Sequence, residues 1–245
     1  MLKIIVENSG ASVSELARTF SVTPATVRSD LSYLEGKRLV VRTHGGAIAR
    51  QGLDEEPLLA ERKHAAEKSA IAANALPLVK SGEVIALDTG TTMTTFAQAL
   101  VASPLANLTL ISPDIQALSI LEARSDFSLI SVGGKIRSGF HFACGAMALD
   151  ILNNLRADAC VLSTTSLDFE QGLTTPDVDT ARIKQKLLEI SRESILLVDS
   201  SKLGHVSCGH FASLEQVDHL VIDAGASETA LAQLRQRVPD VIVAR

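Results

Sequence analysis

Seven short apolar segments recur between residues 83 and 244, and their alternation with helical patterns constrains the fold more than any other feature. They are EVIALD (83–88), LTLIS (108–112), FSLISV (127–132), ACVLST (159–164), SILLVD (194–199), HLVID (219–223) and VIVA (241–244). Helical patterns separate most of them, at about 92–102, 114–124, 145–155, 178–192 and 227–236. Strands that alternate with helices form a largely parallel sheet covered on both faces. We therefore expect an α/β domain over residues 65–245.

Polar residues follow five of these strands, at the edge of the sheet where the carboxyl ends of the strands should meet. The clusters are Asp88-Thr89-Gly90-Thr91-Thr92, Ser112-Pro113-Asp114, Gly133-Gly134-Lys135 with Arg137, Ser163-Thr164-Thr165 and Asp199-Ser200-Ser201-Lys202. Ligands of open parallel sheets bind beyond the carboxyl ends of the strands. The sequence therefore predicts a ligand site at this edge.

The first of these clusters has the chemistry of a phosphate site. Gly90 lets the backbone turn sharply, and Thr91 and Thr92 offer hydroxyl groups where a helix should begin. A helix N-terminus adds free N–H groups and a positive dipole. Lys135 and Lys202 can contribute positive charge. A strand-to-helix turn that uses glycine and threonine only as caps is the simpler alternative for this one cluster.

Carboxylates in the same clusters leave two interpretations open. Asp88 and Asp199 can accept hydrogen bonds from sugar hydroxyls, which fits a binding site. Sugar-phosphate isomerisation would instead need a carboxylate base and a group that stabilises the enediolate. By residue type alone, Asp88, Asp114, Asp168 and Asp199 are candidates for that base, but no pattern singles one out. We expect a binding site and no enzyme.

Residues 1–50 predict a small helical domain of a different kind. SVSE at 12–15 fits a capping box before a short helix, and SVT at 21–23 is a tight turn. Thr23 then caps a second helix with Pro24 at its first position, and Val27 and Leu31 recur at helical spacing. Together with a first helix at 2–8, this is the pattern of a helix-turn-helix, whose second helix enters the major groove of DNA.

The segment LVVRTHGGAIAR at 39–50 predicts a β-hairpin, and hence a wing beside the helix-turn-helix. The candidate DNA contacts are Thr23, Pro24, Thr26, Arg28, Ser29 and Tyr33 in the second helix, and Arg42, Thr43 and His44 in the wing. A small helical domain without a DNA partner is the alternative that the same caps would allow.

The distribution of charge favours DNA binding by this head. The whole chain carries a formal charge of −5, but residues 1–50 carry +3 and the remainder −8. A basic head on an acidic body indicates two separate tasks. Residues 51–64, which contain the proline-stopped LDEEP, predict a linker between them.

The remaining features of the sequence bear on cellular location and on metal binding. No apolar run approaches the roughly 20 residues of a membrane span, and MLKIIVENSG lacks the features of a signal peptide. Three cysteines without CxxC spacing favour reduced thiols in the cytoplasm. His141-x-x-Cys144 and Cys208-x-His210 have no usual zinc spacing, so we expect no metal and no cofactor.

These residues resemble the DeoR-type bacterial transcriptional regulators over nearly the whole chain. The matching motifs are SVTPATVRSDLSYLEGKRLVVRTHGGA (21–47), EK with IA at 67–72, LDTGTT (87–92), GGK (133–135), GLTT (172–175) and DSSK (199–202). The resemblance implies a winged helix-turn-helix joined to a sensor similar in fold to ribose-5-phosphate isomerase. It also implies a repressor of a carbohydrate-use operon, oligomeric as a dimer or tetramer, whose hold on double-stranded operator DNA is controlled by a phosphorylated sugar.

Site residues follow from the resemblance by motif. It assigns the phosphate loop to Asp88, Thr89, Gly90, Thr91 and Thr92, a second wall to Gly133, Gly134 and Lys135, and later polar positions to Lys184, Asp199 and Lys202. It assigns the recognition-helix signature to Arg28 and Asp30, and the wing to Arg42, His44, Gly45 and Gly46.

The chain departs from the family pattern at several of these positions. Ser29 replaces a second recognition-helix arginine, and Ser112-Pro113 replaces Thr-Asn. Ser163 to Ser166 replace a glycine-rich turn, and Thr180 stands where an acidic residue is usual. A body that serves only for oligomerisation, with no ligand, is the remaining alternative.

Overall fold

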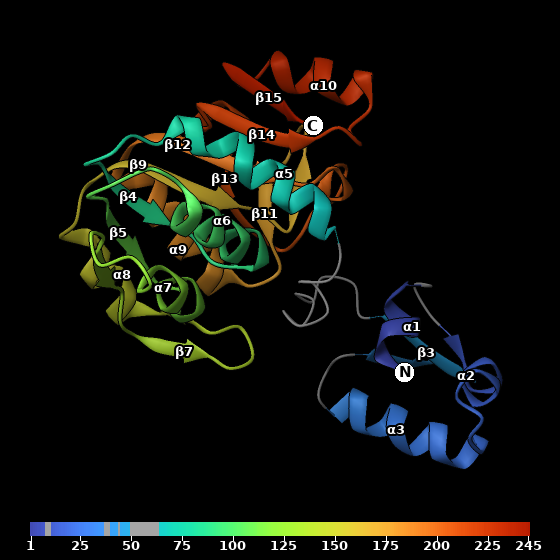
Figure 1. The fold of residues 1–245 in the computed structure, drawn as a ribbon. Coiled ribbons are helices and arrows are strands. Elements are labelled where there is room, and N and C mark those ends of the chain that lie inside the picture. Colours follow the sequence, from blue (N-terminus) through green and yellow to red (C-terminus); the bar gives the residue numbers. More distant parts are fainter. Residues whose placement is uncertain (8–10, 37–39, 44, 50–63) are drawn as a thin grey trace. The chain divides into compact units, whose positions relative to one another are not determined.

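A computed structural model describes residues 1–7, 11–36, 40–43, 45–49 and 64–245 (Figure 1). The chain divides into two compact units, Met1–Leu53 and Asp54–Arg245, which are described separately. The predicted wing residue His44 and residues 51–63 of the predicted linker lie outside the described residues.

The N-terminal unit combines helices with a small antiparallel sheet. Its elements are α1 (Leu2–Glu7), β1 (Ala11–Ser12), α2 (Val13–Phe20), α3 (Pro24–Gly36), β2 (Val40–Thr43) and β3 (Gly46–Ala49). Ile5, Leu16, Val27, Leu31 and Val40 are buried together and form the centre of its core. The apolar stripe predicted for the second helix is therefore the face that packs inward.

The predicted helix caps are present in α2 and α3. Glu15 N–H donates to Oγ of Ser12 over 3.2 Å, and Ser12 N–H donates to Oε2 of Glu15 over 2.8 Å, which completes the capping box. The N–H of Thr26 donates to Oγ1 of Thr23 over 3.2 Å. These bonds satisfy N–H groups that have no partner within the helix.

The predicted wing is an antiparallel hairpin, with Val40 opposite Ala49 and Thr43 opposite Gly46. The sequence did not predict the third strand, β1, which pairs with β3. A side chain at Gly46 would bring its Cβ within 2.3 Å of the carbonyl oxygen of Ala11. The close approach of β1 therefore requires glycine at this position.

The second unit is built on a seven-stranded sheet in the order β15-β14-β12-β9-β4-β5-β6. Its strands are β4 (Val84–Leu87), β5 (Thr109–Ser112), β6 (Ser128–Ser131), β9 (Ala157–Ser163), β12 (Ser191–Val198), β14 (His219–Asp223) and β15 (Asp240–Ala244). Every neighbouring pair is parallel. The seven strands predicted from the sequence are thus confirmed.

Helices cover both faces of this sheet. They are α5 (Ala65–Ala75), α6 (Thr91–Ala102), α7 (Ile115–Leu121), α8 (Ala146–Asn153), α9 (Val178–Glu189) and α10 (Glu228–Arg235). Residues of α5, α6 and α7 share one buried cluster with Ile85 and Leu87 of β4. Residues of α8, α9 and α10 share the other with Ala86 of the same strand. Successive residues of a strand point to opposite faces, so the two clusters lie on the two sides of the sheet.

Two further small sheets were not predicted from the sequence. One contains β10 (Ser166–Asp168), β11 (Gly172–Thr175) and β13 (Gly209–Ala212), all antiparallel. The other is a hairpin of β7 (Lys135–Arg137) and β8 (Phe142–Cys144). The 3-10 helices are η1 (Leu76–Leu78), η2 (Ser200–Lys202) and η3 (Leu214–Gln216). None of the helices within the described ranges has the length and apolar character needed to cross a membrane.

Candidate functional site

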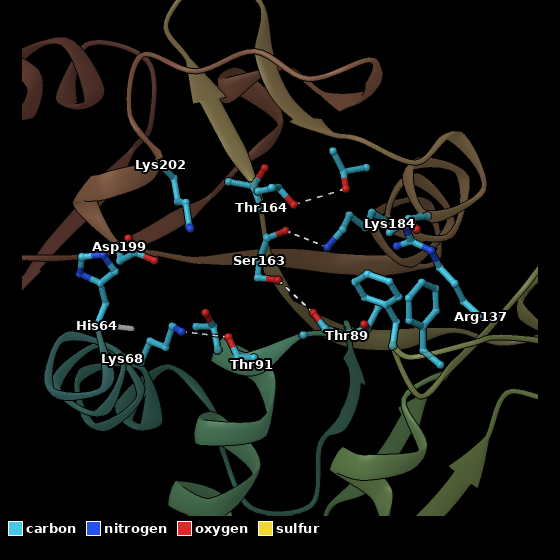
Figure 2. Close-up of a pocket in the computed structure, with 17 residues that line it drawn as sticks. His64, Lys68, Thr89, Thr91, Arg137, Ser163, Thr164, Lys184, Asp199 and Lys202 are labelled. Atoms are coloured by element: carbon cyan, nitrogen blue, oxygen red, sulfur yellow. Dashed lines mark hydrogen bonds between the residues drawn. The ribbon is translucent and has the colours of Figure 1, made fainter. Parts of the chain in front are cut away.

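A cavity of about 140 Å³ lies at the carboxyl edge of the parallel sheet, where the sequence predicted a ligand site (Figure 2). Residues from α5, α6, α9, η2 and the β7–β8 hairpin contribute to its walls. Seven residues of the predicted effector site line it, namely Thr89, Gly90, Thr91, Thr92, Lys184, Asp199 and Lys202. The structure therefore brings together residues that are more than a hundred positions apart in the chain.

The loop between β4 and α6 supplies one wall. Gly90 is the N-cap of α6 and has φ 107°, a conformation that side chains other than glycine rarely adopt. Oγ1 of Thr91 accepts a hydrogen bond from Nζ of Lys68, over 2.9 Å. Thr91 and Thr92 occupy the first turn of α6, where N–H groups lack partners within the helix. This wall thus combines a cation, hydroxyl groups and the positive end of a helix dipole.

Asp88 does not line the cavity but lies directly behind it, fully buried. Its Oδ2 forms an ion pair with Nζ of Lys184 and accepts hydrogen bonds from N and Oγ of Ser163, over 2.9 and 3.1 Å. Lys184 also donates to the carbonyl oxygen of Ser163 over 3.0 Å. Asp88 therefore holds Lys184 and the loop after β9 in place. The sequence had instead predicted that Asp88 accepts hydrogen bonds from sugar hydroxyls.

Asp114 is a second buried carboxylate behind the same loop. Its Oδ1 caps α7 by accepting from the N–H groups of Gln116 and Ala117, over 2.9 and 3.0 Å. Its Oδ2 accepts from the N–H of Gly90 over 3.2 Å, so that N–H is already engaged within the protein. Burial raises the pKa of Asp114, the nearby charge of Asp88 raises it further, and the three N–H bonds offset only part of this.

The loop after β12 supplies the opposite wall. Asp199 is buried, caps η2 and accepts a hydrogen bond from the N–H of Ser201 over 3.2 Å. Lys202 follows within η2 and lines the cavity. Among the described residues, its ammonium group has no hydrogen-bond or ion-pair partner. It is therefore a cation available to a ligand.

Gly133, Gly134 and Lys135 do not line the cavity, although the sequence analysis placed them in its second wall. A Cβ at Gly134 would lie 2.8 Å from the carbonyl oxygen of Cys144 and 3.2 Å from Cβ of Ala148. Gly134 thus allows the start of the hairpin to pack closely on Cys144 and α8. Lys135 is exposed on β7.

Arg137, two residues further along β7, lines the cavity instead. Its guanidinium carbon lies 3.9 Å from the ring centre of Phe140 and 5.9 Å from that of Phe142. Both rings also line the cavity. The hairpin therefore forms a wall that combines aromatic faces with one cation.

The other lining residues were not assigned to the effector site from the sequence. Arg137, Ser163, Thr164 and Thr165 belong to the polar clusters predicted at this edge, whereas His64, Lys68, Phe140, Phe142, Thr175 and Thr180 belong to none of them. Lys68 lies in the EK motif and Thr175 in the GLTT motif, so the resemblance offered a signal for both. Phe140 and Phe142 had no such signal. They belong to none of the matching motifs, and nothing in the sequence around them indicates that they lie near the carboxyl ends of the strands.

The charge of the lining favours an anionic ligand. Among the described residues, the lining contains four cationic side chains, Lys68, Arg137, Lys184 and Lys202, and one carboxylate, Asp199. This positive cavity lies in the part of the chain that carries −8 overall. In the described part of the chain, no group of three or more His, Cys, Asp or Glu side chains could hold a metal ion.

In the N-terminal unit, α3 presents the candidate DNA contacts Thr23, Pro24, Thr26, Arg28, Ser29 and Tyr33 as exposed residues on or beside the helix. Thr43 of the wing is also exposed. Arg42 is only half-exposed, because Nη1 donates to the carbonyl oxygen of Arg28 over 3.3 Å and to Oγ of Ser32 over 3.1 Å. Arg42 therefore joins the wing to α3.

Two family models match the chain. One describes a DeoR-like helix-turn-helix domain and matches residues 1–51, and the other describes the DeoR C terminal sensor domain and matches residues 63–224. The chain belongs to the DeoR family of transcriptional regulators. It is thus a DNA-binding regulator with a sensor domain, and not an enzyme.

Named relatives agree with this assignment. The HTH-type transcriptional regulator YulB of Bacillus subtilis is 34% identical, over 97% of this chain and 92% of its own length. The glycerol-3-phosphate regulon repressor of Escherichia coli is 30% identical, over 91% of this chain and 88% of its own. The regulator GolR of Listeria innocua is 28% identical, over 91% of this chain and 88% of its own length.

Solved structures with a similar fold are more distant. A D-ribose-5-phosphate isomerase in complex with phospho-erythronic acid is 21% identical with a TM-score of 0.41, over 56% of this chain and 53% of that one. The ribose 5-phosphate isomerase of Methanocaldococcus jannaschii is 20% identical with a TM-score of 0.43, over 58% of this chain and 55% of that one. The matched region spans just over half of each isomerase chain.

Proposed function

We propose that this DeoR-family regulator is a repressor of a carbohydrate-use operon, and that a phosphorylated sugar bound in the cavity controls its hold on the operator. The observation that carries the proposal is the wall formed by Lys68 and the N-terminus of α6, with Lys202 on the other side of the cavity. Phosphate is the common biological anion that such an arrangement of ammonium groups and helix N–H groups accepts.

The surroundings of the cavity support a ligand that also carries hydroxyl groups. Between its cations the lining is rich in side-chain hydroxyls, from Ser163, Thr164, Thr165, Thr175 and Thr180. A hydroxyl group can both donate and accept hydrogen bonds, so this surface matches a polyol or a sugar. One relative is named a repressor of the glycerol-3-phosphate regulon, and we propose the same chemical class of small phosphorylated compound here.

For the operator, we propose that α3 lies in the major groove and reads bases with its exposed side chains. Arg28, Ser29 and Tyr33 would face the groove, while Thr43 and His44 of the wing would meet the backbone or the minor groove. Because one helix-turn-helix reads only a short half-site, the protein would bind as a symmetric dimer or tetramer. A protein with this task, whose cysteines are unpaired, would work in the cytoplasm.

Thermal denaturation with a panel of phosphorylated sugars and polyols tests the effector. A ligand at about a hundred times its dissociation constant should stabilise the protein by roughly 2.7 kcal/mol, which raises the melting temperature by a few degrees. The same compounds without phosphate are the matched controls and should give no shift. If no phosphorylated compound shifts the transition, the body serves oligomerisation alone.

A further inference from the structure

The cavity has two ends of different chemistry. Figure 2 places Lys68, Thr91 and Lys202 toward one side, and Arg137 with Lys184 toward the other. At the first end, Lys202 has no hydrogen-bond or ion-pair partner for its ammonium group among the described residues, and the first turn of α6 adds N–H groups. Asp199, the one carboxylate that the described residues contribute to the lining, lies near Lys202 but caps η2. Positive charge therefore exceeds negative charge at this end.

At the other end, carboxylates offset part of the positive charge. Lys184 forms its ion pair with the buried Asp88. Burial raises the pKa of Asp177, but hydrogen bonds from Thr180 and the charges of Arg137 and Lys135 lower it more, so Asp177 offsets part of the charge of Arg137. Less positive charge is therefore available to a dianion at this end.

Among the described residues, phenylalanine rings line the cavity only at this end. Phe140 and Phe142 both line it, and the guanidinium of Arg137 is stacked on Phe140 at 3.9 Å. The stack fixes a planar fork of N–H donors, which can bind hydroxyl or carbonyl oxygens. Ring faces beside it offer apolar contact to C–H groups.

We propose that Arg137, Phe140 and Phe142 read the carbon chain of the effector, while its phosphate lies between Lys68 and Lys202. The β7–β8 hairpin is then the wall that distinguishes one phosphorylated sugar from another. This inference rests on the proposed function, because it assigns an orientation to the ligand of the same cavity. The ligand class is a short phosphorylated sugar or polyol with oxygen atoms at the end remote from phosphate.

Titration calorimetry with two kinds of probe separates the two ends. Inorganic phosphate probes the phosphate end alone, whereas glycerol 3-phosphate, ribose 5-phosphate and fructose 6-phosphate probe both. Arg137→Met removes the donors and keeps an apolar stem over Phe140, and Arg137→Lys keeps the charge but loses the fork. The matched control is Arg124→Met, because Arg124 is likewise stacked on a ring, 4.4 Å from the centre of Phe127, outside the cavity lining.

Arg137→Met should weaken the best-bound sugar phosphate by roughly tenfold, as expected for hydrogen bonds from a charged donor. Its affinity for inorganic phosphate should stay within about twofold of wild type, since the two ends act independently. Arg137→Lys should lose less than Arg137→Met, and Arg124→Met should lower thermal stability without changing either affinity. Lys202→Ala should weaken all probes alike.

Each contrary result has a distinct meaning. If Arg137→Met weakens inorganic phosphate as much as the sugar phosphates, Arg137 holds the phosphate and the inference is wrong. If neither Arg137 variant changes any affinity, the hairpin does not read the ligand, and the inference is again wrong while the proposed function stands. If the wild-type protein binds no probe, the proposed function fails first and the inference falls with it.

Discussion

Nζ of Lys68 in α5 donates a hydrogen bond to Oγ1 of Thr91, the first residue of α6, over 2.9 Å. Lys68 is buried, with 4% of its surface exposed, so its ammonium group lies at the edge of the cavity and away from bulk water. Burial of a charged group is costly unless it meets partners. Lys68 also lines the cavity, so an anionic ligand bound there would lie beside its positive charge.

Lys68→Met should therefore weaken the effector by roughly 10- to 100-fold, the range expected when a hydrogen bond to a charged group is lost. Methionine keeps the apolar stem in place, so the fold should remain intact. Titration calorimetry measures the effect, with the phosphorylated sugar that binds the wild-type protein most tightly. Lys80→Met, at an exposed lysine outside the cavity lining, is the control and should bind normally. Equal affinities for both variants would exclude Lys68 from the site.

Removal of one partner of the buried pair Asp88–Lys184 should destabilise the second unit. Lys184→Met leaves Asp88 buried without its counter-charge, which typically costs about 3–5 kcal/mol. The double variant Asp88→Asn with Lys184→Met should recover part of this loss, because no uncompensated charge then remains. Urea denaturation of the two variants and of Asp88→Asn alone completes the cycle. A double variant no more stable than Lys184→Met would argue that the pair is not the source of the cost.

Asp114 should make stability depend on pH with a sign unusual for a carboxylate. Its pKa is raised by burial, so the folded state binds the proton more tightly than the unfolded chain. The stability that this proton contributes is fully present below the unfolded pKa and is lost as pH rises through the folded pKa. Compared with Asp114→Asn, which does not titrate, wild type should gain free energy of unfolding from about pH 7 to about pH 4.

The matched control for that measurement is Asp168→Asn. Backbone N–H groups of Gln171 and Glu170 lower the pKa of Asp168, so the sign is opposite. Wild type should lose free energy of unfolding relative to this variant as pH falls through the lowered pKa. Denaturant titrations at several pH values measure both differences. A difference that does not vary with pH for Asp114→Asn would contradict the assignment of a raised pKa.

Two arginines of the N-terminal unit should respond differently to truncation. Arg28 is exposed on α3, so Arg28→Ala should leave stability unchanged and weaken the operator by about 1–3 kcal/mol if it reads a base. Arg42 donates two hydrogen bonds to α3, so Arg42→Ala should lower the stability of this unit. Gel-shift titration and thermal denaturation of both variants test this. Unchanged operator affinity for Arg28→Ala would exclude it from the interface.

The parallel sheet could be predicted from the sequence because its strands are buried on both faces. Such strands read as continuous apolar runs, and Val84–Leu87 and residues 195–198 stand out from the helical segments between them. The polar start of β12, from Ser191, was not predicted, and it extends the pairing with β9. The caps at Ser12 and Thr23 were predictable for a similar reason, since local side chains satisfy local N–H groups. The loop between β4 and α6 could be predicted as part of a ligand site from its place after the first strand.

The hairpin wall could not be predicted, because its strands are only three residues long and β7 carries two charged side chains. Its tip turns through Gly139 and His141, both with positive φ, which no apolar pattern records. Two glycines before it looked like a ligand loop, yet Gly134 is there for close packing on α8. The polar residues that enter the cavity are determined by how loops far apart in the chain pack together. The spacing of residues along a single sequence does not show how such loops pack.

We propose that a phosphate bound between the loop after β4 and η2 controls operator binding. The most direct measurement is operator affinity with and without effector, for wild type and for the double variant Thr92→Ala with Lys202→Ala. An effector changes DNA affinity only through its different affinity for the two states of the protein, with typical couplings of about 1–3 kcal/mol. We predict that wild type shows such a change, and that the double variant binds operator normally but does not respond. A double variant that still responds at the same effector concentration would place the ligand elsewhere and exclude control through this cavity.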